Sequence, residues 1–543
     1  MDDRVPDRPR PAGTPEPPPA GARVVTRRNA LLLGALGLAG VAAVPVVAAL
    51  PASAPSPSGA PAAPSPPAPP PTASAPGRAL DPRDFGAVGD GSADDTRALQ
   101  ELLDASAAQG AVAVVPAGTY RCTAGLLLTT GARLQLDGGA HLLKDFAAET
   151  GLVNAFLRNR DFAVKADGVQ ITGPGTIGAR DHSRTGVVLA LYGDDVQLRE
   201  FTIDTYSGGQ AVMFAGDRGR MDGVTIRNSE VDTGTGGIRV IGGADFLATG
   251  CSVESGDDCL QFVPIGNPDA VLYDLDITGG SFVGCTGTST TSRFMVALLE
   301  FTGGEPGTTD MSASVVDCSF RDCRGAGTNR GIVVKNTHSQ GRIEGVSFTD
   351  CSVDMSGAAD AETQEIRIQT DPASRGSISG ITFTRTDVVR PVNSTVRIGG
   401  PNISAVTFDG CTFAAPSGAS PLTLVADQVD GLVVRGCTFT GAPGKRQLVV
   451  GPVEAVTALA VEDSRFTDVP DGVWAVDLLG APGAHVTGST FTAAAGATDA
   501  RAIRVSPASA GVVIEQNDVT GVGNPTPITD RGTGTEIRGN RGE

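Results

Sequence analysis

Short stretches in which apolar and polar residues alternate follow one another along most of the chain, from about residue 80 onward. Alternation with a period of two is the pattern of β-strands with one buried face. Gly, Asp, Asn and Thr separate the stretches and mark turns. Beyond a first helical stretch, the 3.6-residue period of amphipathic helices is absent. The pattern therefore predicts an all-β domain of many short strands.

One phrase recurs through this domain: two alternating apolar residues, two further residues, a small residue or Cys, and then an apolar residue two positions later. Examples are VTIRNSEV from Val224, VSFTDCSV from Val346 and VTFDGCTF from Val406. Most repeats are 23 to 29 residues apart, with three longer steps between residues 280 and 386. A unit this short cannot bury its own apolar face, so neighbouring units must stack. We predict a right-handed parallel β-helix.

The first 78 residues lack this repeat. Arg27 and Arg28 precede an apolar run over 30–50, and small residues follow at 52–54, an order that resembles a twin-arginine export signal. Residues 55–78 are almost all Pro, Ala and Ser, which is typical of a linker. We therefore expect a signal region over 1–54, a linker over 55–78 and the β-helix over 79–543. The protein should act outside the cytoplasm, and its only expected membrane contact is an uncleaved signal anchor, the alternative to cleavage.

Charge and cysteines narrow the function classes. The formal net charge of −18 argues against nucleic acid as a partner, although a local cationic groove remains compatible with an acidic body. No Cys or His cluster has metal-ligand spacing, so no metal is expected.

Nine cysteines are present, and five fall on the same position of the repeat: Cys251, Cys318, Cys351, Cys411 and Cys437. Buried thiols stacked along the core are one interpretation. A disulfide framework is the other, with Cys318–Cys323 and Cys251–Cys259 as the first pairs to consider.

The start of the domain, Asp84-Phe-Gly-Ala-Val-Gly-Asp-Gly and onward to Gln100, resembles the N-terminal segment of pectin-lyase-like β-helix proteins, a group of polygalacturonases, lyases, epimerases and phage tailspikes. The following helix should be capped at Thr96 by Asp94 or Asp95. It should cover the open end of the first coil, where strand edges would otherwise invite association. This resemblance implies a fold and leaves the reaction open.

A second resemblance concerns chemistry. Gly256-Asp257-Asp258-Cys259 matches the Gly-Asp-Asp-Cys signature of polygalacturonase-like, family 28-type glycoside hydrolases. The resemblance implies that Asp257 is the general acid and that Asp258 helps to activate water, because hydrolysis needs one group on each side of the glycosidic bond. The negative charge of one carboxylate also raises the pKa of the carboxyl beside it.

Other parts of that family pattern are missing. Its third carboxylate falls on Gly236, no His occurs between residues 182 and 338, and its Arg-Ile-Lys appears as Val333-Val334-Lys335. The resemblance therefore implies the fold, while pectin hydrolysis does not follow automatically. Glu300, one coil after the Asp pair, is a candidate for the missing carboxylate, and Arg293 is a candidate replacement for the His.

Aligning neighbouring coils predicts a row of cations. The stretches GIVVKN, EIRIQT and TVRIGG place Val333, Arg367 and Arg397 at one outward position and Lys335 at the next, and Arg239 falls on the same face. Charged residues rarely point into a solenoid core. The face is either simply solvated or a groove for a carboxylate-bearing polymer.

Three function classes remain open. The first is a secreted glycoside hydrolase acting on an acidic or plant-type polysaccharide, with Asp257 as acid and Asp258, with Glu300, as base; it needs no cofactor. The second is a polysaccharide lyase or epimerase that relies on Lys335 or Arg367, and a calcium ion at the three carboxylates would favour it. The third is a non-catalytic carbohydrate-binding β-helix in which Gly-Asp-Asp-Cys is a turn.

Overall fold

The computed structural model describes residues 79–543 except 149–150, 181–185, 205–208, 229–234, 265–271, 273, 301–311, 329, 338, 358–364, 372–373, 419–421 and 454. The side chains of Glu300 and Leu422 are also outside the described part. The expected signal region (1–54) and linker (55–78) therefore lie outside the described residues. Within the described part, no helix is long and apolar enough to cross a membrane.

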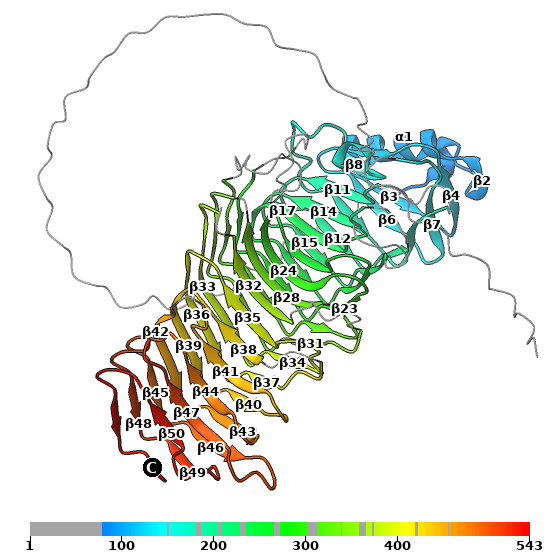
Figure 1. Ribbon diagram of the computed structural model, residues 1–543. Coiled ribbons are helices and arrows are strands. Elements are labelled where there is room, and N and C mark those ends of the chain that lie inside the picture. Colours follow the sequence, from blue (N-terminus) through cyan, green and yellow to red (C-terminus); the bar gives the residue numbers. More distant parts are fainter. Residues whose placement is uncertain are drawn as a thin grey trace, which may run out of the picture. The chain divides into compact units, whose positions relative to one another are not determined.

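The described strands stack coil upon coil into the predicted right-handed parallel β-helix (Figure 1). They form a 35-stranded and a 16-stranded sheet, and the strand pairs are parallel. The larger sheet has two faces, here called face A and face C, that join at β17; the smaller sheet is face B.

Face C carries the candidate site. Its strands are β5 (Leu126–Leu128), β8 (Leu157–Asn159), β11 (Leu189–Tyr192), β14 (Val212–Ala215), β17 (Ile238–Ala244), β20 (Leu260–Phe262), β24 (Arg293–Glu300), β28 (Arg330–Thr337), β32 (Ile366–Thr370), β35 (Val396–Gly399), β38 (Leu422–Ala426), β41 (Arg446–Val450), β44 (Trp474–Leu478), β47 (Arg501–Val505) and β50 (Ile528–Asp530).

Face A consists of β1 (Ala79–Leu80), β3 (Val112–Val115), β6 (Arg133–Leu136), β9 (Gln170–Thr172), β12 (Gln197–Arg199), β15 (Arg220–Asp222), β18 (Leu247–Thr249), β21 (Ile277–Thr278), β22 (Ser281–Val283), β25 (Val315–Val316), β26 (Ser319–Arg321), β29 (Arg342–Glu344), β30 (Ser347–Thr349), β33 (Ser377–Thr384), β36 (Ile403–Asp409), β39 (Val429–Arg435), β42 (Thr457–Glu462), β45 (His485–Thr487), β48 (Val513–Glu515) and β51 (Glu536–Arg538).

Face B consists of β2 (Asp90–Asp94), β4 (Gly118–Cys122), β7 (Ala140–Lys144), β10 (Thr176–Ala179), β13 (Thr202–Asp204), β16 (Thr225–Asn228), β19 (Ser252–Ser255), β23 (Thr286–Ser289), β27 (Arg324–Gly325), β31 (Ser352–Asp354), β34 (Asp387–Val389), β37 (Thr412–Ala414), β40 (Thr438–Thr440), β43 (Arg465–Val469), β46 (Thr490–Ala493) and β49 (Asp518–Gly521).

The core consists of columns of identical or similar side chains. The Phe residues of β26, β30, β33 and β36 illustrate this, because their rings stack with centroids 4.8 to 4.9 Å apart: Phe320, Phe348, Phe383 and Phe408. This spacing is the distance between neighbouring strands, so each ring packs on the one in the next coil. The apolar phrase of the sequence thus becomes a continuous core.

A second column holds cysteines at the turn between faces A and B. Its six thiols directly precede face B strands that pair in register: Cys251, Cys285, Cys323, Cys351, Cys411 and Cys437. Thr386 fills the step between Cys351 and Cys411. All nine cysteines are buried free thiols. The stacked-thiol interpretation is confirmed, and the disulfide interpretation is wrong.

The predicted position of Cys318 in this column is also wrong. Ser319 pairs with Ser281, so Cys318 lies level with Gly280 at the preceding turn, between β25 and β26. The longer coils carry the same phrase at two successive turns, VVDCSF from Val315 and SFRDCRG from Ser319. The sequence pattern alone assigned the earlier of these two turns, with Cys318, to the thiol column.

The N-terminal helix α1 (Thr96–Gln109) buries Leu99, Leu102 and Leu103. It is fastened to the first coils, because the Gln100 amide donates to the Leu127 carbonyl and accepts from its N–H. The expected cap over the first coil is thus present.

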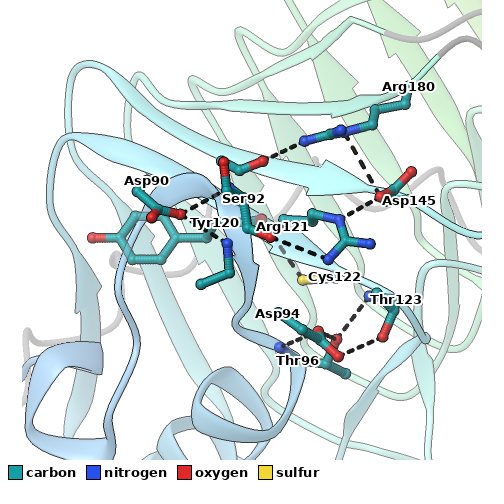
Figure 2. A network of polar contacts seen from close by, with 12 residues as sticks. Asp90, Ser92, Asp94, Thr96, Tyr120, Arg121, Cys122, Thr123, Asp145 and Arg180 are labelled. Atoms are coloured by element: carbon teal, nitrogen blue, oxygen red, sulfur yellow. Dashed lines mark hydrogen bonds and ion pairs between the residues drawn. The ribbon is translucent and has the colours of Figure 1, made fainter.

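Asp94 is the residue that caps this helix. Its carboxylate accepts from the Thr96 N–H at 3.1 Å, from the Thr96 hydroxyl at 2.5 Å and from Thr123 at 2.7 Å (Figure 2). Asp95 is buried and accepts instead from the N–H groups of Val88 and Gly89. The acidic residues of this motif therefore hold the cap in place, as do the contacts of Arg121 and Arg180 with Asp145 beside it.

Candidate functional site

The predicted row of outward residues exists on face C. Strand pairing aligns Arg239 with Gln261, Gln261 with Val296, and Val296 with Val333. The alignment continues from Val333 to Arg367 and Arg397, as the sequence predicted. Lys335 lies two residues further along, opposite Gln369. One face therefore carries cations from several coils.

Asp258 lies two residues before the start of β20 and is 1% exposed. Its carboxylate accepts from the Ser292 hydroxyl at 2.8 Å, from the Arg293 N–H at 3.1 Å and from the Arg293 Nε at 2.7 Å. The Arg293 side chain is 19% exposed. A buried carboxylate needs such partners, because desolvation of an unpaired charge is costly. The pairing makes Arg293 part of the site, in the coil after Asp258.

Asp257 occupies the partly exposed position beside it. Its backbone carbonyl accepts from the hydroxyls of Ser255 and Ser289 at 2.6 and 2.8 Å, which fixes the turn. Burial, together with the negative charge of Asp258, raises the pKa of the Asp257 carboxyl, against the opposing effect of the Arg239 and Arg293 guanidinium groups. Two neighbouring carboxyls in different environments are the arrangement from which enzymes obtain a proton donor.

Amides fill the space where the family pattern has a third carboxylate. Gly236 lies one coil before Asp258, and a Cβ atom at Gly236 would be 1.9 Å from the Gln210 Oε1. Gln261 Nε2 donates to that Oε1 at 2.9 Å and to the Asp258 carbonyl at 2.6 Å. Arg239 Nε donates to Gln261 Oε1 at 2.7 Å. The Asp pair is thus bordered by a buried amide network.

Comparison with known proteins assigns this fold to a family. The family model described as "Rhamnogalacturonase A/epimerase, pectate lyase-like" matches residues 81–351, which include the capping helix, the Asp pair and β28. The chain belongs to the pectin-lyase-like parallel β-helix superfamily. No curated protein matches the chain.

Solved structures of this superfamily's fold are similar at low identity. The family 28 exopolygalacturonase of Yersinia enterocolitica is 16% identical, with 72% of this chain and 79% of that chain covered and a TM-score of 0.51. A mutant tailspike protein of E. coli bacteriophage HK620, solved in complex with a pentasaccharide, is 11% identical, with 84% and 80% covered and a TM-score of 0.52. Identities this low establish the shared fold.

Within this superfamily fold, the predicted site residues do not all meet. Arg239 and Arg293 border the Asp pair. Lys335 lies two strands away from β20 and five residues further along the strand direction than Arg293. Arg367 and Arg397 follow on the third and fourth strands. These three cations extend the face away from the pair.

The backbone of Glu300 ends β24, seven residues beyond Arg293, where it pairs with Thr337. At about 3.3 Å per residue, this is roughly 23 Å along the strand from the Asp258 level. The side chain of Glu300 lies outside the described residues. Within the described part, no group of three or more His, Cys, Asp or Glu side chains is arranged to hold a metal ion.

Sequence reasoning missed Gln210, Gln261 and Ser292. Gln261 gave a signal, since it is the one polar residue of the strand LQF. Ser292 and Gln210 are polar residues in connecting segments and differ in no way from many others in the sequence. Only the stacking of coils reveals that Ser292 donates to Asp258 and that Gln210 accepts from Gln261.

Proposed function

We propose that the protein is a glycoside hydrolase that acts on an acidic or plant-type polysaccharide, with Asp257 as its general acid. The observation that carries the proposal is the Asp pair itself: a partly exposed carboxyl with a raised pKa beside a buried carboxylate that is paired with Arg293. A raised pKa keeps a carboxyl protonated and able to protonate the leaving oxygen. The family description and the exopolygalacturonase named above support a carbohydrate substrate.

Each neighbour has a task in this mechanism. Asp257 donates its proton to the glycosidic oxygen of the leaving sugar while the bond from that oxygen to the sugar carbon breaks. A water molecule forms the new bond to this carbon and releases a proton to solvent, from which Asp257 is protonated again. Asp258 is enclosed and accepts three hydrogen bonds, so we assign it an electrostatic task rather than direct activation of water. Its charge raises the pKa of Asp257 and favours the positive charge that develops on the sugar ring.

Arg239 and Arg293 would attract a sugar carboxylate. Their guanidinium groups border Asp257 from the coils before and after it. An arginine fork offers paired N–H donors to a carboxylate. An acidic substrate is therefore the better match for this position than a neutral one.

The test is incubation with a panel of uronic-acid polymers, with reducing ends and unsaturated products measured in parallel. New reducing ends without unsaturated products, lost in Asp257→Asn, are the expected result. If folded protein releases no product from any polymer of the panel, the hydrolase proposal is refuted.

A lyase or epimerase is the second candidate, because the cations Lys335, Arg367 and Arg397 lie on the same face as the Asp pair. In such reactions a base removes the proton next to a uronate carboxylate, and cations stabilise the resulting charge. The family description names epimerases and pectate lyase-like proteins as well. Unsaturated products, or uptake of solvent deuterium without chain cleavage, would favour this candidate.

Export through the twin-arginine route remains a proposal that rests on the sequence of residues 1–54. Replacing Arg27 and Arg28 together with Lys should retain the protein in the cytoplasm, because both arginines belong to the predicted signal. Unchanged secretion of the double-Lys variant would contradict this route.

A further inference from the structure

Figure 1 shows β41, β44 and β47 of face C near the C-terminal end of the coils. A second cluster of cations comes from these strands. Trp474 in β44 is the only tryptophan of the chain and pairs with Arg501 of β47. Arg504 is aligned with Asp477. Arg446 begins β41, the preceding strand. Seven strand pairings separate β44 from β20, so this cluster is remote from Asp257.

A buried carboxylate fixes two of the arginines. The side chain of Asp477 is fully buried. It accepts from Arg504 Nε at 2.6 Å and Nη2 at 2.5 Å, and from Arg446 Nη1 at 3.2 Å. The Arg504 and Arg446 side chains are themselves 27% and 40% exposed. Their guanidinium groups are thus anchored from below and still reach solvent.

Two guanidinium groups of the cluster pack against the ring of Trp474. The guanidinium carbon of Arg504 lies 4.3 Å from the ring centroid, and that of Arg501 lies 4.7 Å from it. Arg501 is also held by Asp499, at 3.2 Å and 2.9 Å. Cation–π contacts of this kind orient a guanidinium plane and limit its rotamers. The arginines therefore lose little further freedom on binding an anion.

The donors of the cluster are only partly used. Each guanidinium has five N–H donors, and the contacts above engage two donor atoms of Arg504, two of Arg501 and one of Arg446. Three arginines against two aspartates give the cluster a positive charge on a chain whose net charge is −18. This local charge favours an anion.

We propose that the cluster formed by Trp474, Arg446, Arg501 and Arg504 is a second binding site, which takes the carboxylate of an acidic saccharide and performs no chemistry. The choice of a saccharide rests on the proposed function, while the preference for a carboxylate rests on the cluster itself. Guanidinium groups cover the Trp474 ring, which disfavours stacking of a neutral sugar. Arginine forks match a carboxylate.

The unique tryptophan makes the test direct, because the fluorescence of Trp474 reports on this cluster alone. The probe is a short oligogalacturonate, titrated into Asp257→Asn protein so that no cleavage occurs, and compared with a neutral oligosaccharide of equal length. We expect a saturable fluorescence change with the acidic probe only, weakened by added salt. A similar response to the neutral probe would overturn the proposal.

Variants separate a site from a nonspecific charge effect. Arg501→Gln should weaken probe binding by about tenfold, the order of a hydrogen bond to a charged group. The pair Asp477→Asn with Arg504→Gln should do the same without leaving a buried unpaired charge. Arg435→Gln, at an exposed ion pair with Asp409 on face A, is the control and should bind normally. Equal binding by all variants, or no fluorescence response at all, would refute the site.

These outcomes are distinguishable from failure of the hydrolase proposal. Hydrolysis of a polymer without any Trp474 response would leave the proposed function intact and remove the second site. A saturable Trp474 response in a protein that cleaves no polymer would support the second site and remove the hydrolase proposal.

Discussion

The guanidinium of Arg293 lies 2.7 Å from the carboxylate of Asp258, although 35 residues separate the two in the sequence. The pairing of β20 with β24 produces this contact, because it sets both residues at the same level of successive coils. The connecting segment between the two strands is longer than in most coils. Its extra length leaves the register unchanged, so the ion pair depends on strand pairing rather than on spacing in the sequence.

Asp257→Asn should lower kcat by about 10²- to 10⁴-fold and leave KM near its original value, because it removes the proposed proton donor and keeps the shape of the side chain. In the parent protein, activity should fall as pH rises through the raised pKa of Asp257, since the acid then loses its proton. Steady-state kinetics across pH measures both effects. The control is Asp350→Asn, at an exposed ion pair with Arg385, and full activity in Asp257→Asn would contradict the assignment.

Arg293→Gln should reduce the free energy of unfolding by about 3 to 5 kcal/mol, because it leaves the buried Asp258 without its cation. Adding Asp258→Asn should recover a large part of that loss, since the buried charge is then removed as well. Urea unfolding of both single variants and the double variant tests this. Strictly additive losses would mean that the two side chains do not interact.

Glu365 should make stability depend on pH. Its side chain is fully buried, and burial raises its pKa from 4.5 to about 7, although its Oε1 accepts from the N–H groups of Val392 and Asn393. The Oε2 has no hydrogen-bond partner among the described residues. Between pH 4.5 and about 7 the folded protein holds a proton that the unfolded chain releases. The contribution of Glu365 to the free energy of unfolding is therefore most favourable below pH 4.5. It becomes less favourable as pH rises from 4.5 to about 7.

Glu365→Gln keeps the acceptor and removes the charge, so it should flatten this pH dependence and stabilise the protein at pH values above the window. The difference should be on the order of 3 kcal/mol. Urea midpoints on either side of the window measure it, with Glu344→Gln, at an exposed ion pair, as the control. An unchanged slope in Glu365→Gln would show that other groups govern the pH dependence.

Gly236→Ala should destabilise the protein by about 1 to 3 kcal/mol, because the new Cβ displaces the Gln210 amide from its bond with Gln261. Gln210→Ala in the same chain should relieve the contact and make the Gly236 substitution much less costly. Thermal melting of the single and double variants checks this. If Gly236→Ala costs the same in both backgrounds, the amide does not fill that space.

The thiols give a chemical test of the core. In the native protein a thiol reagent should react rapidly with none of the nine cysteines, because all are buried. After unfolding without reductant it should react with all nine, because all are free. The same count with and without reductant is the expected result. A lower count without reductant would indicate disulfides.

Much of this architecture follows from the sequence, because the repeat fixes which residues stack. The row of Val333, Arg367 and Arg397 was predicted correctly since apolar alternation leaves only one register on each strand. Cys318 was misplaced because two successive turns of a long coil carry the same phrase.

The candidate site was harder to predict. The adjacent carboxylates were evident from the motif. Ser292, which donates to Asp258, and Gln210, which accepts from Gln261, lie in segments with no pattern of their own. Glu300 was placed in the correct coil, yet its backbone lies seven residues along the strand from Arg293. A repeat predicts the coil to which a residue belongs, whereas hydrogen-bond partners depend on where each loop returns to its strand.

Because the coils stack in parallel, the number of coils between two sites on face C sets the distance between those sites. Seven strand pairings between β20 and β44 correspond to about 34 Å at the usual strand spacing. Removing residues 386–410, one coil between equivalent positions of the thiol column, would shorten that length by about 4.8 Å and preserve every column. The number of coils that the gene encodes between the Asp pair and Trp474 thus sets the length of the shortest polymer able to reach both at once. Evolution can adjust this length one coil at a time.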